Sequence, residues 1–348
     1  MSNINELSGE MIRDAIDARD RYELLREAEA ELHHSYKGSM RFERRADKEY
    51  LVRTIKGSST QRKSLGVRSP ETEQLLKQFQ AGKARVQDRI AGLRQQIEDR
   101  ASVLVARGLG RMPVLPARVI RQIDRAGLLG KHLTILGTNA LYAYEAAAGV
   151  RIGSDMLATG DVDMLFDARR KLVVGGDVNT KGLIGLLKQV DKTFYKAVGR
   201  SYTAANRDGY QVDLIEPQDH ARIMREGERG MSDVEGDLVA TSTDSSKWLL
   251  NVPKFNAVSF DEKGLPVPLV TLDPRVYALQ KLWIVENDKS RAPDKRQRDA
   301  EQADLVATLA VRHLGLSFDD SALSGLPNSF RELIDKLNFE ESSRSSSW

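Results

Sequence analysis

The sequence predicts a mixed α/β (α+β) protein in which helical regions flank the core. Segments with strand-like and helix-like patterns intermingle within residues 131–273, and the segments on both sides are rich in Glu, Arg, Gln, Leu and Ala at helical spacing. A basic segment at 37–68 interrupts the first helical region. We therefore expect a helical N-terminal region at 1–130, a core at 131–273, a C-terminal helical domain at 274–340, and a disordered polar tail at 341–348.

Composition narrows the function classes. The chain has 348 residues, of which 41% are hydrophobic and 30% charged, and this predicts a soluble globular protein with a well-buried core. The absence of cysteine excludes disulfides, thiolate metal sites and cysteine nucleophiles, and the five histidines lack zinc-binding spacing. No apolar run approaches the ~18 residues of a membrane span, and no signal-peptide core is present. We expect a cytoplasmic protein that does not bind membranes.

The N-terminal region predicts long amphipathic helices at 5–34 and 70–108. The second of these repeats apolar residues at intervals of three and four, at Leu75, Phe79, Ile90, Leu93 and Ile97. Helices of this kind can also pair between two copies of the chain. Homo-oligomer formation through these helices is therefore one alternative, and the sequence leaves the oligomeric state open.

The basic segment at 37–68 predicts a short β-hairpin followed by a flexible basic loop. The segment contains ten Lys and Arg residues and three acidic residues, so its net charge is +7, while the whole chain carries only +3. Phe42 and Tyr50 lie among the basic residues, so the hairpin could follow phosphates and stack a base of RNA or DNA. A structural or partner-docking role is the alternative, and we favour it slightly.

The core elements follow one another in a recognisable order. A short helix within 112–130 ends at Gly130 and leads into a strand at 133–136. The sequence then predicts a helix at 139–148, a strand near 161–166, a helix at 182–195, a strand at 209–217 and a hairpin at 255–272. Two further helices are expected after Pro274.

Three aspartates lie on strands that otherwise look buried. Asp161 and Asp163 are two residues apart and therefore point to the same side of their strand, and Asp213 interrupts the apolar run of the 209–217 strand. At ~5 Å and an effective dielectric constant of ~20, two carboxylates repel each other by roughly 3 kcal/mol. Such a cluster is stable when acids are protonated or when cations lie among them. Mg²⁺, or Mn²⁺ in its place, suits open carboxylates together with phosphate oxygens.

The turn at Gly137-Thr138 supplies groups for an anion. A glycine between a strand and a helix lets the backbone approach a ligand, and the free N–H groups of the following helix favour phosphate. The Thr138 hydroxyl is placed to meet a phosphate oxygen, and Asn139 can cap the helix or hold the turn. The acids and the turn together indicate binding of a metal–nucleoside triphosphate (NTP) complex.

This order of strand, Gly-Thr turn, helix, paired acids and third acid resembles the minimal nucleotidyltransferase fold. DNA polymerase β, poly(A) polymerases, aminoglycoside nucleotidyltransferases and several bacterial toxins share that fold. The chain is most similar to a poorly characterised bacterial family of this superfamily over residues 36–310, through "LYAYEAAAGV", "ATGDVDMLFD", "NRDGYQVDLIEP" and "DPRVYALQKLW". The resemblance implies that Gly137 and Thr138 bind phosphates and that Asp161, Asp163 and Asp213 bind the metal. Thr138 stands where the superfamily usually has serine.

The resemblance also suggests residues outside this core pattern. Related enzymes direct a lysine at the triphosphate from the helix in which Lys281 lies, although Lys281 could equally belong to a solvated helix face. Lys295 lies in a basic helix start similar to one found late in such enzymes. The alternative is an ordinary helix N-terminus with Asp299 and Glu301 near its dipole.

Two residues of the helix at 139–148 are weaker candidates. Glu145 and Tyr142 could line the nucleotide pocket, and Tyr142 suits the core better.

The function that these features predict is metal-dependent transfer of a nucleoside monophosphate from an NTP to an acceptor hydroxyl or phosphate. The basic segment makes RNA, including tRNA, a slight favourite as acceptor, with protein and small molecules as alternatives and a toxin or defence role as a further one. The competing hypothesis is a catalytically inactive module that binds nucleotide or nucleic acid. The presence of all three acids argues against that hypothesis, because loss of one would impair metal binding.

Overall fold

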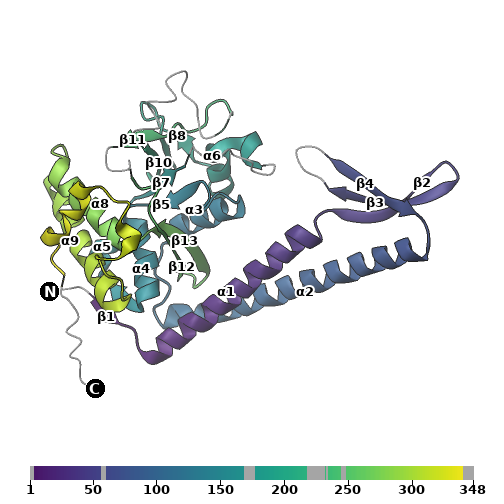
Figure 1. The fold of residues 1–348 in the computed structure, drawn as a ribbon, viewed down its shortest axis with the longest axis horizontal. Helices are drawn as coiled ribbons and strands as arrows, with labels where there is room; N and C mark the ends of the chain where they lie inside the picture. Colours follow the sequence, from purple (N-terminus) through teal and green to yellow (C-terminus); the bar gives the residue numbers. More distant parts are fainter. Residues whose placement is uncertain are drawn as a thin grey trace. The chain divides into compact units, whose positions relative to one another are not determined.

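The computed structural model describes residues 4–55, 60–167, 177–217, 232, 234–243 and 248–339, with the backbone alone at 177–180. The predicted tail at 341–348 lies outside these residues. The chain divides into two compact units, which we call the hairpin unit and the core unit (Figure 1). The hairpin unit comprises Glu10–Gly110 and Lys263–Pro266, and the core unit comprises Met1–Gly9, Arg111–Glu262 and Val267–Trp348.

Two long helices form the body of the hairpin unit. Helix α1 (Gly9–Ser35) and helix α2 (Pro70–Ala106) run side by side (Figure 1) and bury a shared apolar strip that includes Leu25, Val86 and Ile90. Ser69 begins α2 with a capping box, in which its hydroxyl accepts from the Thr72 N–H. Apolar residues every three to four positions thus form the helices that the sequence predicts.

A three-stranded antiparallel sheet completes the hairpin unit. Strand β2 (Ser39–Arg45) pairs with β3 (Lys48–Ile55), and β3 pairs with β4 (Gln61–Val67). The predicted hairpin is therefore present. The prediction of a flexible loop after it was wrong for β4, an edge strand whose first four residues are exposed. Such a strand depends on backbone pairing, which hydrophobic periodicity does not reveal.

The core unit is built on a mixed sheet with the order β12-β13-β5-β7-β10-β9-β8, and β11 pairs with β10. Neighbouring strands β7 and β10 are parallel, whereas β5 and β7 are antiparallel, so the predicted mixed α/β class is confirmed. The strands are β5 (Leu133–Ile135), β7 (Asp161–Phe166), β8 (Tyr195–Lys196), β9 (Thr203–Ala205), β10 (Gln211–Pro217), β11 (Thr241–Thr243), β12 (Lys254–Phe260) and β13 (Pro266–Leu272). A separate pair joins β1 (Ile4–Glu6) to β6 (Val150–Ile152).

Helices cover the core sheet and extend beyond it. Helix α4 and the pair α8 and α9 contribute buried residues to one large apolar cluster with the strands. The helical elements are α3 (Val114–Arg125), η1 (Thr138–Ala140), α4 (Leu141–Ala148), α5 (Ser154–Leu157), α6 (Asp177–Val190), α8 (Pro274–Asn287), α9 (Pro293–Thr308), η3 (Leu309–His313), η4 (Ser321–Leu323), α10 (Asn328–Arg331) and η5 (Ile334–Lys336). Within the described residues, no helix has the length and apolar character to cross a membrane.

Candidate active site

The three predicted acids lie on neighbouring strands of the core sheet. Strands β7 and β10 are parallel and in register, so that Asp163 is the direct Cα partner of Asp213, and Asp161 is that of Gln211. Val162 and Val212, which alternate with these acids, are fully buried. Because alternate side chains of a strand point to opposite faces, the three carboxylates share the face opposite these core residues. We call this surface the acid face.

Burial, and after it the crowding of like charges, raises the pKa of two of the acids. Burial, together with the charges of Asp161 and Asp213, raises the pKa of Asp163 from 3.8 to about 7, although Lys281 and Arg291 partly offset the rise. Burial also raises the pKa of Asp213, and its Oδ1 atom is buried without a hydrogen-bond partner among the described residues. An unpaired carboxylate oxygen beside a second acid suits a bound cation.

Asp161 is held differently from the other two acids. Its carboxylate accepts a hydrogen bond from the Thr159 hydroxyl, and its backbone carbonyl accepts one from the Asn139 side chain, with Nδ2 2.7 Å away. Within the described part of the chain, no group of three or more acidic or histidine side chains has a geometry that could hold a metal ion. The acids therefore share one face without forming a complete metal site.

The predicted turn brings the backbone against the acid face. Gly137 has a φ of 61° and a ψ of −156°, and a Cβ atom at this position would overlap the Asp163 carboxylate. Glycine is therefore required both by the backbone conformation and by the close approach. The turn continues as the short helix η1, and the regular helix begins at Leu141, two residues later than the predicted 139.

The side chains that follow the glycine are already engaged. Thr138 Oγ1 accepts from Arg298 Nη2 at 3.2 Å and from Gln302 Nε2 at 3.4 Å, and both donors lie on α9. Asn139 fixes the turn to the start of β7 through its bond to Asp161 and does not cap the helix. The sequence left open whether Asn139 caps the helix or holds the turn, and in the structure it holds the turn.

Lys281 is buried at the acid face, so the alternative of a solvated helix face was wrong. Its side chain is only 10% exposed, and its Nζ atom lies 2.6 Å from Asp299 Oδ1. Arg291 Nε lies 2.6 Å from the other oxygen of Asp299. Burial lowers the pKa of Lys281, while Asp299 and Asp163 raise it. Because two cations share one carboxylate, the Lys281–Asp299–Arg291 cluster carries a net positive charge beside the acids.

The remaining candidates have other positions. Lys295 is exposed on α9. Glu145 is buried, where it accepts from Arg111 and from the Ile152 N–H, so it supports the fold. Tyr142 is 3% exposed and belongs to the core cluster, as predicted, although it also lines a small cavity.

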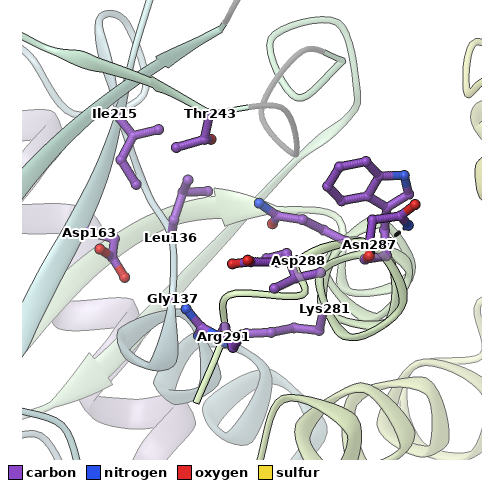
Figure 2. A pocket seen from close by; sticks show the side chains of 12 residues that line it. Leu136, Gly137, Asp163, Ile215, Thr243, Lys281, Asn287, Asp288 and Arg291 are labelled. Carbon is purple, nitrogen blue, oxygen red and sulfur yellow. Dashed lines mark hydrogen bonds between the residues drawn. The ribbon is translucent and has the colours of Figure 1, made fainter. Parts of the chain in front are cut away.

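A cavity of about 380 Å³ adjoins the acid face. Figure 2 shows Asp163 on one side and Lys281, Asn287 and Asp288 on the other, with Arg291 beside Gly137. Its size lies within the range of small-molecule pockets, and its walls offer two acids, a glycine backbone and two cations. We call it the nucleotide cavity.

Sequence analysis missed Arg291, Arg298, Gln302 and the central role of Asp299. Arg298 and Gln302 are four residues apart on α9 and therefore share a helix face, and that spacing was the available signal. Their target, Thr138, is 160 residues away from Arg298 in the chain.

The glycine turn lies beside neighbouring acids, and Lys281 and Arg291 line the same cavity, so this surface suits a phosphate-containing ligand together with a cation. The comparison with known families agrees, because a family model described as nucleotidyltransferase matches residues 115–326. The chain belongs to this family. No curated protein and no solved structure matches it.

Proposed function

We propose that the protein is an active, divalent-metal-dependent enzyme that transfers a nucleoside monophosphate from an NTP to an acceptor hydroxyl or phosphate. The observation that carries this proposal is the close approach of Gly137 to Asp163, which is itself paired in register with Asp213. A phosphate held at the backbone of this turn would lie directly beside two carboxylates. Acids that served only the fold would be matched with lysine or arginine, whereas Asp213 keeps an unpaired oxygen.

Each group has a distinct task in this proposal. Gly137 offers its backbone to the β- and γ-phosphates, and Lys281 and Arg291 neutralise part of their charge. Asp163 and Asp213, joined by Asp161, would hold Mg²⁺ or Mn²⁺, which supplies charge neutralisation for the phosphates when bound. Arg298 and Gln302 hold the Thr138 hydroxyl next to the Gly137 turn.

The reaction itself is a displacement at the α-phosphorus. The acceptor oxygen forms a bond to that phosphorus, and the bond between it and the bridging oxygen breaks. Pyrophosphate leaves with the electron pair of the broken bond, and the acceptor gives up its proton. Asp213 is the candidate base for that proton, because burial has raised its pKa.

The basic segment is a candidate surface for RNA as a partner, although ion pairs reduce the charge of that segment. Glu43 lies within 4.0 Å of Arg41, Arg45 and Arg62. Arg68 is shared between two further acids. Arg44, Lys48 and Lys63 are exposed and keep their charges for a polyanion, so we retain RNA contact as a proposal.

Self-association is a separate proposal for the hairpin unit. Ile12, Ile16 and Leu24 of α1 are each 39–48% exposed, so α1 presents apolar side chains outside its contact with α2. A mass measurement by light scattering tests this, and a monomer at all concentrations would exclude it.

The enzyme hypothesis is tested with NTPs labelled at either the α- or the γ-phosphate, incubated with Mg²⁺ and with RNA, protein or small-molecule fractions of a cell extract. We expect transfer of the α-label alone, and its loss in Asp163→Asn and Asp213→Asn. Asp208→Asn is the matched control, because Asp208 is exposed and outside the acid face. Transfer of the γ-label would refute nucleotidyl transfer. Mg²⁺-dependent NTP binding without any transfer would favour the inactive binding module.

A further inference from the structure

A second cavity, of about 260 Å³, adjoins the acids from the Asp161 side. Its lining includes Arg111, Asn139, Ser154, Thr159 and Tyr210, together with prolines, Leu157 and the ring of Tyr142. None of these residues lines the nucleotide cavity. We call it the tyrosine cavity.

Two polar atoms at the tyrosine cavity lack a hydrogen bond of ordinary geometry among the described residues. Asn139 is 1% exposed, and its Nδ2 atom donates to the Asp161 carbonyl, so its Oδ1 atom remains as an unsatisfied acceptor. The Tyr210 hydroxyl is likewise buried and forms no hydrogen bond of ordinary geometry, although it interacts with the Asn139 side chain. A buried polar group without a hydrogen bond destabilises a protein by about 1–3 kcal/mol. A ligand hydroxyl would supply the missing donor to Asn139 and a partner to Tyr210.

The charge of the tyrosine cavity is already compensated. Its one cationic lining residue, Arg111, donates to both oxygens of Glu145 at 3.1 and 3.2 Å and to the Ile152 carbonyl at 2.6 Å. The single cation here is thus matched by a carboxylate of its own, whereas Lys281 and Arg291 at the nucleotide cavity share one carboxylate, that of Asp299. The tyrosine rings, prolines and leucine favour the flat face of a ring.

The two cavities are connected through the acids. Asp163 lines the nucleotide cavity. Asp161, two residues earlier on β7, is held by Thr159 and Asn139, which both line the tyrosine cavity. A ligand that displaces the Thr159 hydroxyl from Asp161 would also free this acid to join Asp163 and Asp213.

We propose that the tyrosine cavity is the acceptor site, and that it takes a neutral ring bearing a hydroxyl group, such as a sugar or a phenol. This proposal rests on the proposed function, because it assigns the nucleotide to the other cavity. The ring hydroxyl would donate to Asn139 Oδ1 or bond to Tyr210. The acceptor oxygen then forms the bond to the α-phosphorus, and pyrophosphate leaves as described above.

The test measures binding of methyl β-glucoside and p-cresol by saturation-transfer NMR, with glucose 6-phosphate, phenyl phosphate and the dinucleotide ApA as charged counterparts. We expect a neutral ring to bind, with and without saturating Mg²⁺–ATP. Tyr210→Phe should weaken ring binding about fivefold, as loss of one hydrogen bond does. Ser154→Tyr should block the cavity from its exposed rim. Tyr195→Phe is the matched control, because Tyr195 is exposed on β8. The affinity for Mg²⁺–ATP should be the same in all of these variants.

Several outcomes would overturn the proposal. Absence of ring binding, or binding that both Tyr210→Phe and Ser154→Tyr leave unchanged, would exclude the tyrosine cavity as a ring site. Displacement of the ring by Mg²⁺–ATP would place it in the nucleotide cavity. Tighter binding of the phosphorylated probes or of ApA would refute a neutral acceptor and favour RNA. Ring binding in a protein that does not bind Mg²⁺–ATP would instead refute the proposed function, and the acceptor role with it.

Discussion

Replacement of Asp163 by asparagine should stabilise the metal-free protein at alkaline pH. Burial and the charges of Asp161 and Asp213 raise the pKa of Asp163 to about 7, so the folded state binds this proton more tightly than the unfolded state, in which the pKa is near the ordinary value of 3.8. A raised acid pKa lowers stability as the pH rises through the window between these two values. Wild type should therefore lose stability from pH 4 to pH 8, and the variant should lose less.

The size of the effect follows from the two pKa values. A shift from 3.8 to about 7 corresponds to about 4 kcal/mol of lost stability at pH 9 and about 1.7 kcal/mol at pH 5. The Asp163 side chain is partly accessible and the acid face can relax, so the full shift overestimates the effect. We expect Asp163→Asn to raise the free energy of unfolding of the metal-free protein by about half of the calculated loss, roughly 1–3 kcal/mol. In a unit of this size such a change moves the melting temperature by about 3–8 °C.

Thermal unfolding in a chelating buffer between pH 5 and pH 9 provides the measurement. Asp208→Asn is the control for the loss of an exposed acid. Saturating Mg²⁺ should reverse the order of wild type and Asp163→Asn, because only wild type keeps the full ligand set. A variant that melts many degrees below wild type at pH 9 would show that Asp163 is a structural acid, and our interpretation of the acid face would be refuted.

Three further variants test the surroundings of the acid face. Gly137→Ala should lower NTP affinity at least about tenfold and destabilise the protein, because the new methyl group meets Asp163. Gly127 has a similar positive φ but open space around it, so Gly127→Ala measures the backbone strain alone. Equal effects of the two substitutions would refute the clash with Asp163. Thr138→Ser should keep NTP affinity within about threefold, whereas Thr138→Val should lower it about tenfold, because serine but not valine can accept from Arg298 and Gln302. Equal affinities of the two variants, measured by calorimetry, would show that the hydroxyl is dispensable. Asp299→Asn should destabilise the protein by about 3–5 kcal/mol in urea unfolding, because Lys281 and Arg291 lose their shared carboxylate. Asp294 is exposed on the same helix, so Asp294→Asn should destabilise the protein by less than about 1 kcal/mol. Equal losses of stability would contradict the buried ion pair.

The placement of the three acids on one face of neighbouring strands could be predicted because its signal is local. Asp161 and Asp163 are separated by one apolar residue, and Asp213 lies between two, so a period of two is enough to place the carboxylates on the side of each strand that faces away from the core. The glycine turn is local in the same sense, since a single residue changes the chain direction between β5 and η1. Such patterns need no knowledge of distant residues.

The partners of these groups could not be predicted, because long-range packing determines them. Asp299 resembles a helix-dipole acid in the sequence, and only the packing of α9 against α8 brings it to Lys281. The sequence around Thr138 indicates no partner for its hydroxyl, and only the packing of α9 brings Arg298 to it. Strand β4 was missed for a related reason: its polar edge residues carry no alternation, and only pairing with β3 makes them a strand.

The position of Asp161 shows why the strand placement of an acid does not by itself give the direction of its carboxylate. Its place on β7 follows from local periodicity, but the direction of its carboxylate depends on Thr159, whose hydroxyl it accepts. A carboxylate engaged by a neutral hydroxyl is released at little cost, since one hydrogen bond contributes only about 1 kcal/mol. A metal ion or an acceptor hydroxyl at Thr159 would therefore be enough to bring Asp161 to Asp163. Because the charges of Asp161 and Asp213 already raise the pKa of Asp163, a cation bound among the three acids would relieve a repulsion that the empty protein carries.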